Sequence, residues 1–233
     1  MNSIHGVIIC GGNATRFAES VGKSYPYPKH LEMLGDKSVL GYALDGLVAN
    51  IPISSVTFIL NPNLEGMYVD HLKILQESRR DLHLSYAPEI EEEYDSVFTK
   101  IKKSVCEGVY TLDGQRFELG NPVITIALGD LVITEGNTEA LKRDVATYFP
   151  DISDGKSFAI FRNGLQGLIY WVSRISEVGE SRPDISRDAQ EYFLKWWNCN
   201  AIEDLLIAKR DLGYPLTEDE IRKLNSRFGR ERM

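Results

Sequence analysis

The stretch HGVIICGGNATRF, residues 5–17, decides the fold. Residues 5–10 form a short apolar run rich in β-branched side chains, which predicts a buried strand, and the run leads directly into Gly11 and Gly12. Paired glycines let the backbone approach a ligand closely and turn its N–H groups toward an anion. Thr15 adds a hydroxyl and Arg16 a planar fork that matches phosphate oxygens. Ligands collect at the carboxyl ends of strands in open α/β sheets, so the stretch predicts a first strand followed by a phosphate-binding loop.

The rest of the chain alternates predicted strands and helices, which indicates an α/β fold with a mixed, mainly parallel sheet flanked by helices. Strands are expected at 56–60, 82–86, 122–128, 157–161 and 168–172, and helices at 38–50, 64–79, 95–106, 137–148, 204–212 and 217–227. Residues 177–188 are polar and turn-rich and are expected to form a loop. We expect one domain over 1–233, with a hairpin insertion at 108–119 around Asp113-Gly114 and a helical extension at 213–233.

Composition narrows the class of protein. The chain has 233 residues, 43% of them hydrophobic, which is enough for a sizeable core. A net charge of −8 argues against a nucleic-acid binder, and no apolar run approaches the roughly 20 residues of a membrane helix. The amino-terminal residues lack the features of a signal peptide. The cysteines, Cys10, Cys106 and Cys199, are few and widely spaced, which favours packing roles in a reducing cytoplasm over a disulfide framework.

A second basic residue follows the loop. Lys29 lies in Pro26-Tyr27-Pro28-Lys29-His30-Leu31, where two prolines are expected to hold the segment extended and to present the lysine as a point charge. The residues Gly22-Lys23-Ser24 do not complete a P-loop, because its first glycine would fall at Phe17, and no dinucleotide fingerprint follows the first strand. An ordinary tight turn is the alternative interpretation of Gly11-Gly12 taken alone.

The blocks G-G-x-x-T-R-F at residues 11–17 and P-K-x-L at 28–31, followed by a turn at 35–38 and a helix, resemble the opening of the nucleotidyltransferase superfamily. That superfamily includes sugar-1-phosphate nucleotidylyltransferases, cytidylyltransferases and the guanylyltransferases of molybdenum-cofactor and cobamide synthesis. The resemblance implies a glycosyltransferase-A-like, Rossmann-like fold in which Arg16 and Lys29 are catalytic, Lys29 neutralising the α-phosphate. It also implies a nucleotide site made of Gly11, Gly12, Asn13, Thr15, Arg16 and Ser96. Similar loops carry glycine where this chain has Asn13 or Ala14.

Two further positions are candidate metal ligands. Asp130 ends the apolar run 123–128 after Gly129, so it would hold Mg²⁺ rigidly beside a phosphate; a turn-capping role is the alternative. Residues 197–205 resemble the N-x-N-T-P-E-D-L stretch of several nucleotidyltransferases, which implies that Asn200 is a second metal contact, with Asn198 as its substitute. Here the alternative is that both asparagines are turn and cap residues.

The sequence therefore predicts a cytoplasmic, Mg²⁺-dependent enzyme that moves a nucleoside monophosphate from an NTP to a small phosphorylated acceptor, such as a sugar 1-phosphate, an alcohol phosphate or a phosphonate, and releases pyrophosphate. We expect no nucleic-acid or membrane partner, and homo-oligomerisation stays open. Two alternatives remain. A glycosyltransferase of similar architecture is disfavoured because the chain has no D-x-D. A non-catalytic nucleotide-binding module is suggested by the departures at Asn13-Ala14, Asp95 and Ala201-Ile202.

Overall fold

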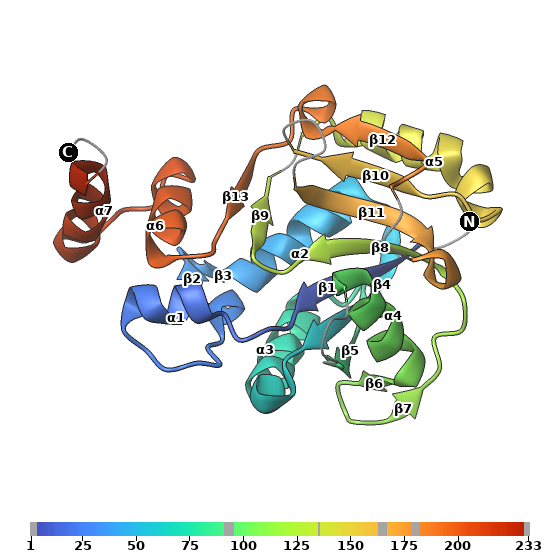
Figure 1. Cartoon of the computed structure of the whole chain (residues 1–233), viewed down its shortest axis with the longest axis horizontal. Coiled ribbons are helices and arrows are strands. Elements are labelled where there is room, and N and C mark those ends of the chain that lie inside the picture. The colour runs from blue at the N-terminus through green and yellow to red at the C-terminus, as the bar shows by residue number, and fades with distance from the viewer. Residues whose placement is uncertain (1–3, 91–95, 135, 163–166, 179–181, 231–233) are drawn as a thin grey trace.

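The computed structural model describes residues 4–90, 96–134, 136–162, 167–178 and 182–230, with side chains as far as residue 225. Its centre is a sheet of nine strands in the order β12-β10-β11-β8-β1-β4-β5-β6-β7. Four neighbouring strands run parallel: β8 (Val123–Leu128), β1 (Ile4–Cys10), β4 (Ile53–Leu60) and β5 (His83–Pro88). Their carboxyl ends meet at one edge of the sheet and point toward α1 (Thr15–Val21) (Figure 1).

Antiparallel strands extend the sheet on both sides. Beyond β8, β11 (Leu168–Arg174) is antiparallel to it, β10 (Phe158–Phe161) is antiparallel to β11, and β12 (Ile185–Asp188) runs parallel to β10. Beyond β5, the hairpin of β6 (Val109–Thr111) and β7 (Arg116–Phe117) forms the other border. The sheet is mixed and largely parallel, which confirms the fold class expected from the sequence.

Helices cover the two faces of the sheet. Successive residues of β1 point to opposite sides, so Ile8 packs in the core beneath α2 (Val39–Asn50), α3 (Glu65–Ser78) and α5 (Thr138–Ser153). Val7 packs on the other side, against α4 (Val97–Glu107). The α2 helix begins where predicted because the Ser38 hydroxyl accepts the Gly41 N–H at 3.0 Å.

A third, smaller core lies beside the carboxyl edge and joins the two ends of the chain. It contains Phe17 of α1, Val132 of β9 (Leu131–Ile133) and Leu205 of α6 (Ile202–Asp211). The remaining elements are β2 (Met33–Leu34), β3 (Lys37–Ser38), β13 (Trp196–Asn198), α7 (Glu218–Arg230) and the 3₁₀ turns Lys29–Leu31, Pro62–Leu64, Ile175–Glu177 and Ala189–Tyr192.

Two local expectations were wrong, and two short strands were not predicted. Within the expected loop 177–188, residues 185–188 form β12, because pairing with β10 satisfies backbone groups that the local sequence does not reveal. Lys29 does not lie in an extended segment but begins a 3₁₀ turn directly after Pro28. The short strands β9 and β13, which pair with one another, were not predicted; Asp130 directly precedes β9 and Asn198 ends β13. The expected helix start at Asp95 lies outside the described residues.

Two bulk expectations concern membranes and thiols. No helix in the described part of the chain is long and apolar enough to cross a membrane. Cys10, Cys106 and Cys199 are free thiols, and Cys10 and Cys199 are buried.

Candidate active site

The glycine-rich loop leaves β1 in a conformation that favours glycine. Gly12 has φ 78° and Ala14 has φ 50°, so the left-handed region is reached once by glycine and once by alanine. The loop is tied to the two strand ends beside it. The Gly12 N–H donates to the Glu89 carboxylate at 2.6 Å, and Asn61 Nδ2 donates to the Gly12 carbonyl at 2.8 Å. One backbone donor of the loop is therefore already directed at an anionic group.

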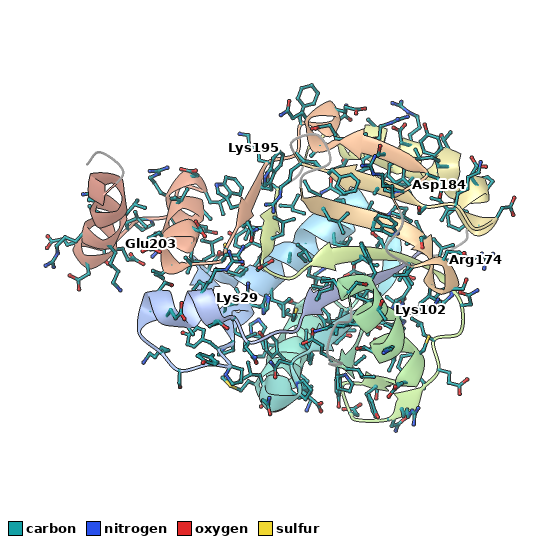
Figure 2. The ribbon with its side chains drawn as sticks, in the orientation of Figure 1. Lys29, Lys102, Arg174, Asp184, Lys195 and Glu203 are labelled. Carbon is teal, nitrogen blue, oxygen red and sulfur yellow. The ribbon has the colours of Figure 1, made fainter. Side chains whose placement is uncertain are left out.

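Lys29 is held by the residues on both sides of it. The Tyr27 ring stacks on Phe17 with centroids 5.7 Å apart, which fixes the segment against α1. His30 is 3% exposed, and its Nδ1 lies 2.6 Å from the Tyr68 hydroxyl in the core. Burial lowers the pKa of His30 to about 4, so this side chain is a neutral anchor. Because His30 points into the core, Lys29 is directed to the sheet edge (Figure 2).

Asp130 reaches the same place from β8. The Gly129 N–H donates to the Ile9 carbonyl at 2.8 Å, and a Cβ on Gly129 would lie 2.6 Å from Cys10 Sγ, so only glycine allows this approach. The turn directs the Asp130 carboxylate at Lys29, with Nζ 2.5 Å from Oδ2. Their side chains are 11% and 15% exposed, so water screens this ion pair only partly.

Asn200 arrives from the far end of the sequence. Pairing of β13 with β9 places Asn198 opposite Leu131, and the Cys199 N–H donates to the Asp130 carbonyl at 2.9 Å. Asn200 Oδ1 then accepts from Lys29 Nζ at 3.1 Å. Asn200 Nδ2 donates to Asn198 Oδ1 at 2.6 Å, which fixes the amide so that its oxygen faces the lysine. Asn198 therefore orients Asn200, and it is the Asn200 oxygen that reaches Lys29.

Lys29, Asn200 and the glycine-rich loop line a cavity of about 290 Å³. Its lining consists of Gly11, Gly12, Ala14, Thr15, Arg16, Phe17, Lys29 and Asn200. Thr15 and Arg16 are exposed, and among the described residues Arg16 forms no ion pair with a carboxylate. Figure 2 shows Lys29 beside α1, and Lys102 and Arg174 lie on the opposite side of that view. The cavity thus combines backbone donors, a hydroxyl and two cations.

The oxygens beside Lys29 fit a hard divalent cation. The ammonium of Lys29 lies where one carboxylate and one amide oxygen converge. Among the described residues no group of three or more His, Cys, Asp or Glu side chains could hold a metal. One carboxylate and one amide suit Mg²⁺, which usually keeps several waters and binds substrate phosphates. The residues therefore fit a cation whose coordination is completed by phosphate oxygens.

The buried thiols nearby are unsuited to nucleophilic chemistry. Burial raises the pKa of Cys199 to about 12, and the Asp130 charge adds to this shift. Burial and Asp130 also raise the pKa of Cys10. Both thiols stay protonated near neutral pH, in agreement with packing roles.

Two of the predicted nucleotide-binding residues, Asn13 and Ser96, do not line the cavity. Asn13 is exposed in the loop, and its Oδ1 accepts from Asn61 Nδ2 at 3.3 Å. Ser96 caps α4, accepting from the Thr99 N–H at 3.2 Å, and does not line this cavity. The contact of Glu89 with Gly12 was not predicted from the sequence. The available signal was its position directly after β5, at the carboxyl edge of the parallel strands.

Comparison with known proteins agrees with this architecture. No family model matches the chain, and no curated protein matches it by sequence. A UDP-glucose pyrophosphorylase complexed with UDP-glucose superposes with a TM-score of 0.62 and 12% identity, covering 90% of this chain and 98% of the other. UTP-bound UGPase from Acinetobacter baumannii gives a TM-score of 0.59 and 10% identity, over 95% and 98%.

A protein assigned as a glucose-1-phosphate thymidylyltransferase from Bacillus anthracis, complexed with a sucrose, gives a TM-score of 0.60 and 11% identity, over 94% of this chain and 99% of that one. These similarities cover nearly the whole length of every chain and confirm the resemblance at the level of the fold. This chain has the fold of the sugar-1-phosphate nucleotidylyltransferases.

Proposed function

We propose that the chain is a Mg²⁺-dependent nucleotidylyltransferase that transfers a nucleoside monophosphate from an NTP to a small phosphorylated acceptor and releases pyrophosphate. The proposal rests on one observation: Lys29, Asp130 and Asn200 converge beside a glycine-rich loop at the carboxyl edge of the sheet. The structural neighbours favour a sugar 1-phosphate as the acceptor.

The residues around the cavity have separate tasks in this reaction. The loop N–H groups, Thr15 and Arg16 bind the triphosphate and keep the leaving pyrophosphate in line with the attacking oxygen. Lys29 stabilises the negative charge that develops around the α-phosphorus. The acceptor phosphate is already ionised near neutral pH, so attack by its oxygen needs no general base. Positioning and charge neutralisation carry the catalysis.

Asp130 and Asn200 are the residues that would hold the metal. When bound, Mg²⁺ neutralises phosphate charge and templates the phosphate oxygens. Lys29 Nζ contacts both ligand oxygens in the structure, so we expect the lysine to turn toward the phosphates when the metal and NTP enter. Asn198 keeps the Asn200 oxygen facing the site.

Pyrophosphate release tests the proposal. The purified protein is incubated with Mg²⁺, each of the four NTPs and a panel of sugar phosphates, alcohol phosphates and phosphonates. We expect a signal that requires one NTP and one acceptor and that disappears in Asp130→Ala. Asp45→Ala is the matched control, because Asp45 also pairs with cations, Lys37 and Arg79, but neither of these cations lines the cavity.

Transfer of sugar from a nucleotide-sugar without pyrophosphate would replace the proposal with a glycosyltransferase. NTP binding with no turnover across the whole panel would instead favour a nucleotide-binding module.

A further inference from the structure

A second cavity lies at the amino-terminal ends of the parallel strands, away from the candidate active site. Its volume is about 380 Å³, within the range of small-molecule sites. One side of it is lined by residues near the starts of three strands: His5, Ser55 and His83, which are register neighbours on β1, β4 and β5. Its roof is the β6–β7 hairpin, which Figure 1 shows on the side of the molecule away from α1.

At these strand ends, polar side chains form a continuous series of hydrogen bonds on a sheet face that is otherwise apolar. Val7 and Ile59, further along the same strands and on the same face, pack in the core with α4. At the amino ends, Ser55 Oγ lies 2.7 Å from His5 Nδ1, and His5 Nε2 lies 2.8 Å from Thr57 Oγ1. Thr57 Oγ1 lies 2.8 Å from Ser85 Oγ. The chain therefore crosses three adjacent strands.

The direction of these hydrogen bonds follows from their end point. Ser85 donates its hydroxyl proton to the Val56 carbonyl at 3.2 Å, so Thr57 donates to Ser85 and His5 Nε2–H donates to Thr57. Burial keeps His5 neutral, and its Nδ1 accepts the Ser55 proton. Because Ser55 donates its hydroxyl proton to His5, the half-buried Ser55 offers the cavity an acceptor oxygen. A ligand that contacts Ser55 must therefore donate a hydrogen bond to this oxygen.

The walls restrict the ligand further. Leu112, Leu119 and the half-exposed ring of Phe117 supply apolar surface from the hairpin side. Among the described residues that line the cavity there is no lysine or arginine, and Asp113 contributes a negative charge. A phosphorylated compound would find no cation here, which separates this cavity chemically from the candidate active site.

We propose that this cavity binds a small, uncharged, hydroxyl-rich ring, an unphosphorylated sugar. Its hydroxyls donate to Ser55 and the neighbouring polar groups, and its apolar face lies on Phe117. Four observations support this assignment: the volume of the cavity, the acceptor oxygen of Ser55, the ring of Phe117, and the absence of lysine and arginine from the described lining residues. It does not depend on the reaction proposed for the other edge.

Histidine resonances test the site directly. The chain has four histidines: His5 and His83 line this cavity, whereas His30 adjoins Lys29 and His71 contacts Ser38. The full-length protein, labelled with ¹⁵N only in its histidines, is titrated with glucose, galactose, mannose and N-acetylglucosamine. We expect at least one sugar to shift the His5 and His83 signals and to leave those of His30 and His71 in place.

Two variants and one ligand complete the test. Phe117→Ala should weaken the binding of that sugar about tenfold, and Phe193→Ala, which truncates an exposed ring elsewhere, should not. The 1-phosphate of the same sugar should bind this cavity more weakly than the free sugar. The proposal is overturned if no sugar shifts His5 or His83, if His30 and His71 respond instead, or if Phe117→Ala binds as the wild type does.

Discussion

The two ends of β1, β4 and β5 differ in chemistry although the same three strands form both. At the carboxyl edge the chain turns through glycines, exposes Arg16, and places the Lys29–Asp130 ion pair beside backbone N–H groups. At the amino edge the groups are hydroxyls and a neutral histidine, hydrogen-bonded across the sheet face. Charge is thus concentrated where loops leave parallel strands, and that edge is where ligands of α/β sheets collect. The contrast predicts that charge changes matter at one edge and polar packing at the other.

The largest effect is expected from Lys29→Met at the carboxyl edge. Removing a preorganised cation beside the reacting phosphate should lower kcat/KM by about 10²–10³. The matched control is Lys37→Met, because Lys37 also pairs with an aspartate, Asp45, at a more exposed position outside the cavity. Both variants are assayed for pyrophosphate release and for urea unfolding. A normal rate for Lys29→Met would show that the charged edge is not catalytic.

At the amino edge, the expected effect is on how the free energy of unfolding depends on pH. Burial lowers the pKa of His5 from 6.5 to about 4. His5 of the unfolded chain therefore binds a proton below about pH 6.5, whereas His5 of the folded chain binds one only below about pH 4. The free energy of unfolding has its full contribution from His5 above about pH 6.5 and loses it as the pH falls from about 6.5 to about 4. At about pH 5 this amounts to roughly 2 kcal/mol for His5 alone.

Urea unfolding near pH 7.5 and near pH 5 checks this expectation. His5→Gln should reduce the pH dependence by the share of His5. His30 loses stability in the same sense, because burial lowers its pKa to about 4 as well, so part of the dependence remains. Equal pH dependence in His5→Gln and the wild type would contradict the neutral, buried state of this histidine.

The two edges also differ in how far the sequence reveals them. Residues 10–17 and 129–130 were predictable because a strand, glycines and a charged residue follow one another directly in the chain. The contact of Glu89 with Gly12 spans 77 positions, and the chain from Ser55 through His5 to Ser85 depends on the register of three strands. Such contacts arise only when strands pair, so local patterns cannot reveal them. The β12 strand was missed for the same reason: its pairing with β10 overrides a polar, turn-rich sequence.

A smaller effect at the carboxyl edge concerns Glu89. Its carboxylate accepts the Gly12 N–H at 2.6 Å, so an incoming phosphate meets both an occupied donor and a negative charge. Two unit charges 4 Å apart interact by about 1 kcal/mol in water, so Glu89→Ala should tighten NTP binding roughly fivefold. Calorimetric titration of NTP in the presence of Mg²⁺ measures this change. The opposite result, weaker binding in Glu89→Ala, would show that the carboxylate binds the nucleoside.

The smallest effect compares one backbone position from each region. Both the glycine-rich loop and the β6–β7 hairpin place a residue in the left-handed region, at Ala14 with φ 50° and at Gly114 with φ 82°. An L-residue there costs about 1–2 kcal/mol, and glycine loses about 0.5–1 kcal/mol in unfolded-chain entropy. Ala14→Gly should therefore stabilise the protein by about 0.5 kcal/mol, and Gly114→Ala should destabilise it by a similar amount.

Urea unfolding of both variants checks the pair, with Ala18→Gly inside α1 as the control that should destabilise by about 1 kcal/mol. If Ala14→Gly is stabilised but slower in pyrophosphate release, the alanine fixes the loop in its working geometry, and its backbone strain belongs to the function of the charged edge. If the variant is stabilised and equally fast, the strain has no such role. In that case the two positions differ only in residue type: the left-handed conformation favours glycine, which is present at position 114 and absent at position 14.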